Sequence, residues 1–188
     1  MKMILKNVRI AYPHLFEPYA YQDGPNPKYE ATFMIPKDDE DQLASLRQAV
    51  KAAAARKWEG KKPSELHNPI KDGDELSTEA FNGHWIVVAR SKPRDGGGGR
   101  PGVVLPNLQP ANPEDIQSGD FVNADVNAYA YDTSGNKGVS FGLNNVQLCM
   151  KGDRIGAGKS RPENVFDALQ TAGSPEQSGE GGDDENWF

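Results

Sequence analysis

The chain has 188 residues, of which 36% are hydrophobic, and carries a formal net charge of −6. This length suffices for one domain with its own core, and no stretch approaches the roughly 18 apolar residues of a membrane-spanning helix. The sequence therefore argues against a helical membrane protein, and its single cysteine excludes an intramolecular disulfide.

The negative charge is unevenly distributed along the chain. Residues 171–188 contain five acidic and no basic residues, which leaves 21 basic and 22 acidic residues in the rest, a net charge of −1. An acidic average therefore does not exclude phosphate binding, which depends on local clusters of cations. At the start of the chain, Lys6 and Arg9 interrupt the apolar run that a signal peptide needs. Together with the lone cysteine, this predicts a cytoplasmic protein.

The first part of the chain is predicted to form two strands and one helix. Apolar residues alternate over 3–12 and again over 28–35, which is the pattern of a half-buried strand. The segment 12–27 between them is rich in proline and aromatic residues and is expected to be a loop. Over 38–58, apolar residues recur at helical spacing, with acids at the start and bases at the end. This segment is predicted to be a helix capped by Asp38.

The middle of the chain is predicted to contain a buried strand between two loops. His84–Ser91 is an apolar run with β-branched residues, which favours a strand. The polar segment 60–83 before it is expected to be a loop with a short helical turn near 64–67. Four consecutive glycines make 92–102 a flexible loop, and 103–105 is predicted to be a short strand.

A β-hairpin is the clearest prediction in the second half of the chain. The residues alternate from Phe121 to Asp132, turn formers follow over 132–136, and a second alternating run covers 138–143. One face of the first strand is polar yet carries Tyr129 and Tyr131. Such a face suits stacking of planar ligands such as nucleobases. The alternative is that the two tyrosines cover a core under a neighbouring loop, with only their hydroxyls in water.

Aromatic and basic residues together suggest a surface for single-stranded nucleic acid. Aromatic rings stack on any base, and cations follow the phosphates. The candidate stacking residues are Tyr129, Tyr131, Trp85, Tyr21 and Tyr19, and the candidate phosphate-binding residues are Arg90, Lys92, Arg94, Arg100 and Lys137. The simpler alternative is that Trp85 belongs to the core, the early tyrosines hold their own loop, and the basic side chains are solvated.

Enzymatic and metal sites have weak support in the sequence. The GAGKS segment at 156–160 is similar to a phosphate-binding P-loop, but Asp153 stands where that motif has its first glycine. A nucleotide hydrolase is therefore the less favoured alternative. The three histidines have no cysteine or carboxylate at ligand spacing, and no serine lies in a nucleophile elbow. The sequence predicts no enzyme, no cofactor and no metal.

The end of the chain combines acids with large aromatic residues. Glycine, serine, proline and acids dominate from residue 171, and such a composition is typical of disorder. At the very end of this tail, the residues predicted to bind a partner are Asp183, Asp184, Glu185, Trp187 and Phe188. Two aromatic side chains in a polar tail leave water only by docking into a pocket. That pocket belongs either to a partner protein or to the protein's own groove.

This tail resembles the C-terminal tip of bacterial and phage single-stranded-DNA-binding proteins. The match consists of Asp183, Asp184 and Phe188, while Asn186-Trp187 replaces the Ile-Pro of the bacterial tip. The opening LKNVRIAYPHLFEP and the hairpin segment GDFVNADVNAYAYDTSGNKGVSFGLNNVQ are similar to a family of phage single-stranded-DNA-binding proteins. This resemblance covers residues 1–150. It implies an OB-type five-stranded barrel that binds single strands without sequence preference, and a tip that recruits replication or recombination proteins.

The sequence thus predicts a mainly β protein with an OB-like five-stranded barrel. The DNA-binding domain is expected at 1–160, with the helix at 38–58 and the basic loop at 92–102, followed by a disordered acidic tail at 161–188. The expected function is binding and protection of single-stranded DNA in phage replication, recombination or repair, in the cytoplasm of the bacterial host. Self-association stays open. The alternative is a β-barrel protein-interaction module that binds no nucleic acid.

Overall fold

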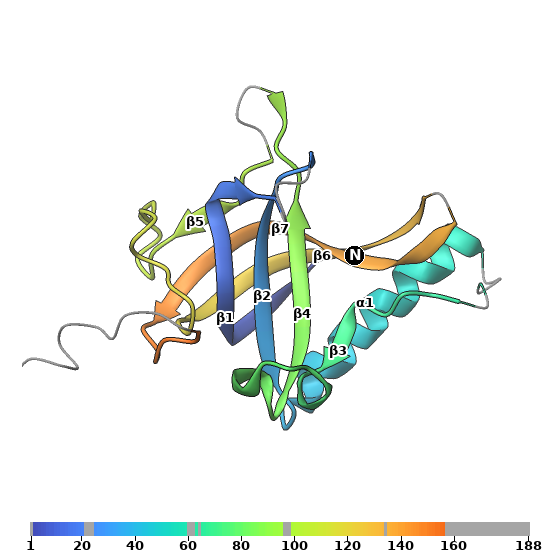
Figure 1. Cartoon of the computed structure of the whole chain (residues 1–188), viewed down its shortest axis with the longest axis horizontal. Coiled ribbons are helices and arrows are strands. Elements are labelled where there is room, and N and C mark those ends of the chain that lie inside the picture. The colour runs from blue at the N-terminus through green and yellow to red at the C-terminus, as the bar shows by residue number, and fades with distance from the viewer. Residues whose placement is uncertain are drawn as a thin grey trace, which may run out of the picture. The chain divides into compact units, whose positions relative to one another are not determined.

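The computed structural model describes residues 2–20, 25–59, 63, 65–95, 99–133 and 135–156. The elements of this part are β1 (Lys2–Tyr19), β2 (Lys28–Pro36), α1 (Glu40–Trp58), β3 (Ile70–Asp72), β4 (His84–Ser91), β5 (Gly102–Val104), β6 (Phe121–Thr133) and β7 (Asn136–Met150) (Figure 1). Within these residues, no helix is both long and apolar enough to cross a membrane.

Five of the strands close into a barrel. β1 pairs with β2 and β6, β2 pairs with β4, and β6 pairs with β7, all antiparallel. A short parallel pairing of β4 with β7, at Ala89↔Phe141 and Arg90↔Gly142, completes the circle. The prediction of a mainly β, OB-like five-stranded barrel is confirmed.

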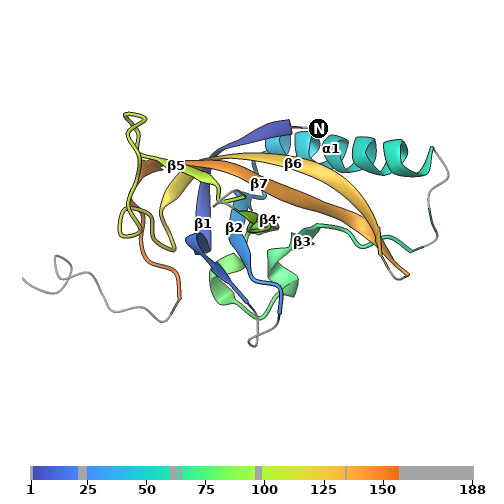
Figure 2. The ribbon, with the colours of Figure 1, turned by 90° about the horizontal axis from the view of Figure 1, so that it is seen from above.

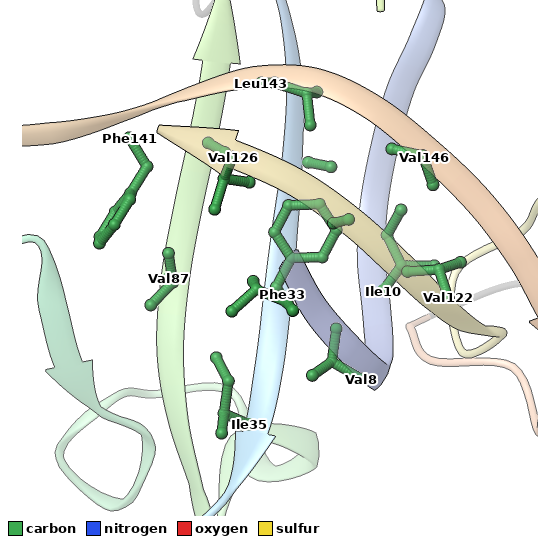
Figure 3. Packing of buried hydrophobic residues seen from close by; sticks show 14 of the residues in the cluster. Val8, Ile10, Phe33, Ile35, Val87, Val122, Val126, Phe141, Leu143 and Val146 are labelled. Atoms are coloured by element: carbon green, nitrogen blue, oxygen red, sulfur yellow. The ribbon is translucent and has the colours of Figure 1, made fainter. Parts of the chain in front are cut away.

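The barrel interior is filled by the inward faces of its strands (Figure 3). On β6, Val122, Ala124, Val126 and Ala128 are buried, Ala130 on the same face is partly buried, and the residues between Val122 and Ala128 are partly exposed. Phe33 of β2 and Phe141 of β7 are the largest fully buried side chains. Period two therefore separates a core face from an outer face on β6, whereas β2 is buried on both faces from Ala31 to Ile35.

The helix α1 begins two residues later than the sequence predicts and packs against β6 and β7 (Figure 2). Its cap is Asp39, not Asp38: the Asp39 Oδ1 accepts a hydrogen bond from the backbone N–H of Gln42 at 3.1 Å. The Gln42 side chain also bonds both backbone groups of Lys6, which ties the helix to β1. The apolar stripe that faces the barrel consists of Leu43, Leu46, Ala49 and Ala53.

The prediction of a loop over 12–27 is wrong for its first half. β1 continues to Tyr19, because β2 supplies backbone partners at His14↔Glu30 and Tyr19↔Lys28. Two residues with left-handed backbone angles, Asn7 (φ 50°) and Tyr12 (φ 48°), accompany register shifts in this bent strand. Pairing with a neighbour thus extends the strand through a proline-containing segment.

The prediction of a loop over 60–83 also needs correction. This segment contains β3, which pairs with β4, and two short 3₁₀ turns, the second of which buries Phe81. The described residues of the helical turn expected near 64–67 are not helical. Instead, His67 forms a bridge to Gly138 of β7. These short elements gain their hydrogen bonds from strands that are distant in the sequence.

Candidate nucleic-acid interface

A groove of about 1030 Å³ lies over β4, β6 and β7. Its other walls are Lys28 at the start of β2, the segment 67–71, and the described parts of the connection between β4 and β5. The groove therefore collects residues from six separate parts of the chain.

The hairpin contributes an aromatic floor to the groove. Tyr129 and Tyr131 of β6 both line it, and Tyr129 is 43% exposed. Their cross-strand partners on β7 are small, Ser140 and Gly138 respectively. A Cβ on Gly138 would lie 2.7 Å from the Tyr131 Oη and 2.9 Å from its Cζ, so the tyrosine side chain covers the glycine. The missing side chain on Gly138 thus lets the Tyr131 side chain lie close to the sheet.

The two tyrosines lie on the part of the hairpin that projects beyond the barrel. β1 pairs with β6 only as far as Asn127, so the next residues of β6 have β7 as their strand partner in the described structure. On the other side of β7, the backbone N–H of His67 donates to the Lys137 carbonyl at 2.9 Å. The Val139 N–H donates to the His67 carbonyl at 3.3 Å. The segment around His67 therefore widens the sheet and forms one side of the groove.

Basic side chains surround this floor. The cations that line the groove are Lys28, Lys71, Arg90, Lys92, Arg94 and Arg100, and its described lining includes no carboxylate. Arg90 forms an ion pair with Glu30. The other five cations have no carboxylate partner among the described residues, and Arg100 lies over the Phe16 ring at 4.9 Å from its centroid. Their charge is therefore available to an anionic ligand.

Six of the residues predicted from the sequence thus meet in one groove: Tyr129, Tyr131, Arg90, Lys92, Arg94 and Arg100. Their chemistry suits a polymer that carries both planar bases and phosphates. The rings offer stacking surface and the cations offer charge, and neither group requires a particular base.

Other predicted site residues lie elsewhere. Trp85 packs at the edge of the core, with the Lys37 Nζ 5.3 Å and the Arg47 Cζ 5.4 Å from its ring centroid, and does not line the groove. Tyr19 stacks on His14 with ring centroids 4.4 Å apart. Lys137 pairs with Asp132 at 3.6 Å. Neither Tyr19 nor Lys137 is part of the groove lining.

Several predictions fall outside the described residues. They concern Tyr21, the acidic tail 161–188 and its residues Asp183, Asp184, Glu185, Trp187 and Phe188. All but the first residue of the GAGKS segment lies outside them as well. Within the described ranges, no group of three or more His, Cys, Asp or Glu side chains could hold a metal ion.

Among the polar residues of the groove that sequence reasoning missed are Lys28, His67, Lys71 and Asn127. Two of them had a signal, because Lys28 and Asn127 alternate with inward residues of their strands and so point outward. His67 and Lys71 had none, since the segment that carries them reads as a polar loop.

Comparison with known proteins adds an independent finding. Residues 1–177 match the family model described as the single-stranded-DNA-binding protein of Enterobacter phage Enc34. The chain is 34% identical over 183 residues to protein p50 of Acyrthosiphon pisum secondary endosymbiont phage 1, covering 92% of this chain and 96% of that protein.

Two solved structures are similar to the chain. One is the Enc34 phage single-stranded-DNA-binding protein in complex with single-stranded DNA, with a TM-score of 0.70, 25% identity, and coverage of 82% of this chain and 89% of that one. The other is gp2.5, a single-stranded-DNA-binding protein encoded by bacteriophage T7. Its TM-score is 0.57 at 17% identity, covering 79% and 91% of the two chains, and this likeness concerns the fold alone.

Proposed function

The chain belongs to the family of the Enterobacter phage Enc34 single-stranded-DNA-binding protein, and we propose that it binds and protects single-stranded DNA without sequence preference. The observation that carries this proposal is the groove, in which Tyr129 and Tyr131 lie among cations that lack carboxylate partners in the described structure. The relative solved with single-stranded DNA supports it.

The chemistry of the groove favours single strands over duplex. A single strand exposes the faces of its bases, which can stack on Tyr129 and Tyr131, whereas a duplex buries those faces in its own stack. The phosphates of the same strand follow Lys28, Lys71, Lys92, Arg94 and Arg100, the five cations without carboxylate partners in the described structure. Binding is then expected to weaken as salt rises, because each neutralised phosphate releases counterions.

The proposal extends to the finer features predicted from the sequence. It places the DNA-binding domain at 1–160 and assigns to the tail 161–188 the recruitment of replication, recombination or repair proteins in the host cytoplasm. The acids and aromatic rings of the tip share the chemistry of single-stranded DNA, so the tail also competes for the groove. The function requires no catalysis, no cofactor and no metal.

The proposal is tested by fluorescence anisotropy of a labelled oligo-dT titrated with the full chain at two salt concentrations. Unlabelled duplex of equal length serves as competitor. We expect tight binding that weakens with salt and that duplex displaces poorly.

Two outcomes would contradict the proposal. If duplex displaced the labelled oligo-dT as well as an unlabelled single strand does, binding would depend on the cations alone and not on stacking against the tyrosines. Absence of binding by the full chain and by a chain without residues 171–188 would instead favour a β-barrel protein-interaction module.

A further inference from the structure

Ser91 is the last residue of β4 and lines the groove between Arg90 and Lys92. Its hydroxyl oxygen is buried and has no hydrogen-bond partner among the described residues. No other buried side-chain oxygen or nitrogen in that part of the chain lacks a partner. The Ser91 hydroxyl is thus the exception to hydrogen-bond pairing among the buried side chains of the described residues, and Ser91 belongs to the candidate site.

A buried hydroxyl without a partner is unfavourable, because it loses its hydrogen bonds to water and gains none in the protein. Most buried polar groups in folded proteins are paired, so each unpaired one requires an explanation. A ligand that supplies the missing partner is one such explanation. The surroundings of Ser91 indicate which ligand that is.

The surroundings of Ser91 are cationic. A Cβ on Gly99 would lie 1.9 Å from the Lys92 carbonyl oxygen, so the two ends of the connection between β4 and β5 touch each other. This contact brings Arg100 close to Lys92. On the other side, Ser91 pairs with Tyr29 of β2, the residue after Lys28. Lys28 and Arg90 alternate with this pair and point to the opposite face, but they line the same groove as Ser91, together with Lys92 and Arg100, and these cations attract phosphates.

We infer that the Ser91 hydroxyl donates a hydrogen bond to a phosphate oxygen of the bound strand. This inference rests on the proposed function and adds to it a donor that carries no charge. Ser91 lines the groove, and rotation about its Cα–Cβ bond moves the hydroxyl among three staggered positions. Lysine and arginine attract phosphates over a range of positions, whereas a hydroxyl bond is short and directional. Ser91 thus fixes the position of one phosphate relative to β4.

The test compares Ser91→Ala and Ser91→Thr with the wild-type full chain. Anisotropy titrations with labelled oligo-dT are made at four salt concentrations, and thermal unfolding is recorded without DNA. Ser45→Ala, an exposed serine on α1 outside the groove, is the matched control.

Ser91→Ala is expected to bind oligo-dT about tenfold more weakly, since it loses a hydrogen bond to a charged group. The slope of log affinity against log salt is expected to stay unchanged, because no cation is lost. The unfolding temperature of this variant is expected to equal or exceed that of the wild type, because the unpaired hydroxyl is gone. Ser91→Thr keeps the donor and is expected to bind within about twofold of the wild type.

Three results would overturn the inference. One is a Ser91→Ala chain that binds as tightly as the wild type. Another is a Ser91→Ala chain that loses affinity together with salt slope or unfolding temperature, since this would reveal a structural role. The third is a folded Ser91→Thr chain that binds as weakly as Ser91→Ala. A wild-type chain that binds no oligo-dT at any salt would instead remove the proposed function itself.

Discussion

Tyr131 and Gly138 are cross-strand partners, and the absence of a side chain on the glycine leaves the space that the tyrosine occupies. The same relation recurs four pairs along the hairpin, where a Cβ on Gly142 would lie 2.7 Å from the Asn127 Oδ1. Glycines of β7 therefore leave room for side chains of β6 beside the groove.

Replacing Gly138 by alanine is expected to weaken binding of oligo-dT by about 1 kcal/mol. The new Cβ would lie 2.7 Å from both the Tyr131 Oη and the His67 Cβ, so it displaces the Tyr131 ring, the His67 segment of the groove wall, or both. Stacking on one ring is worth roughly 1–3 kcal/mol. Anisotropy titration measures the change. Gly102→Ala is the matched control, because its Cβ would lie 2.4 Å from the Asn145 Oδ1, a side chain outside the groove lining. Equal losses in the two variants would contradict a specific role for the part of the groove around Gly138.

Replacing both Tyr129 and Tyr131 by alanine is expected to weaken single-strand binding by about 2–4 kcal/mol while the chain stays folded. The estimate assumes one stacked base per ring. A double phenylalanine variant keeps the rings and is expected to bind nearly as well as the wild type. Titration with oligo-dT and circular dichroism measure the two properties. A folded double alanine variant of unchanged affinity would remove both residues from the site.

Replacing Lys92 and Arg94 by alanine is expected to reduce the salt dependence of binding. Each lost phosphate contact lowers the slope of log affinity against log salt by about 0.7 for a single strand. Arg56→Ala with Lys57→Ala removes the same charge from exposed positions on α1, outside the groove. If both pairs changed the slope equally, net charge and not the position of the cations would govern binding.

Deleting residues 171–188 is expected to leave binding of single-stranded DNA equal or tighter, because a competing anionic segment is removed. Recruitment of partner proteins is expected to be lost. A full-length chain with Trp187→Ala and Phe188→Ala keeps the acids and separates aromatic from electrostatic competition. Affinities for oligo-dT are compared at low salt. Much weaker binding by the truncated chain would rule out competition by the tail.

Acid is expected to weaken an ion-pair cluster outside the groove. The Lys37 Nζ lies 2.6 Å from carboxylate oxygens of both Asp72 and Asp74. Hydrogen bonds from Lys37 lower the pKa of both carboxyls below the usual 3.8. The same hydrogen bonds raise the pKa of Lys37. Because the two carboxyl pKa values are lower in the folded state, their contribution to stability is present above about pH 4. That contribution disappears as the pH falls through the folded values.

The unfolding temperatures of the wild type and Lys37→Met are therefore expected to differ at pH 7 and to converge toward pH 3. The difference is expected to be small, since all three side chains contact solvent. Thermal unfolding followed by circular dichroism measures it. A difference that stays constant from pH 7 to pH 3 would mean that Lys37 acts through its packing on Trp85 alone.

Local patterns were enough to predict the parts of this protein whose structure depends on near neighbours. In the hairpin, apolar residues recur every second position, and in α1 they recur at helical spacing. Both periods arise because each element buries only one of its faces against the core. The prediction failed where partners come from a distance. β1 extends to Tyr19 because β2 lies beside it, and β3 forms because β4 does.

The sequence by itself determined the β-hairpin, the outward face of Tyr129 and Tyr131, and the basic character of the connection after β4. Each of these properties follows from residue type and spacing along one segment. Only the tertiary structure decided that Lys28 and Lys71 join the groove while Trp85 does not. The reason is that a groove consists of side chains from several strands, and the closure of the barrel through β4 and β7 determines which strands meet.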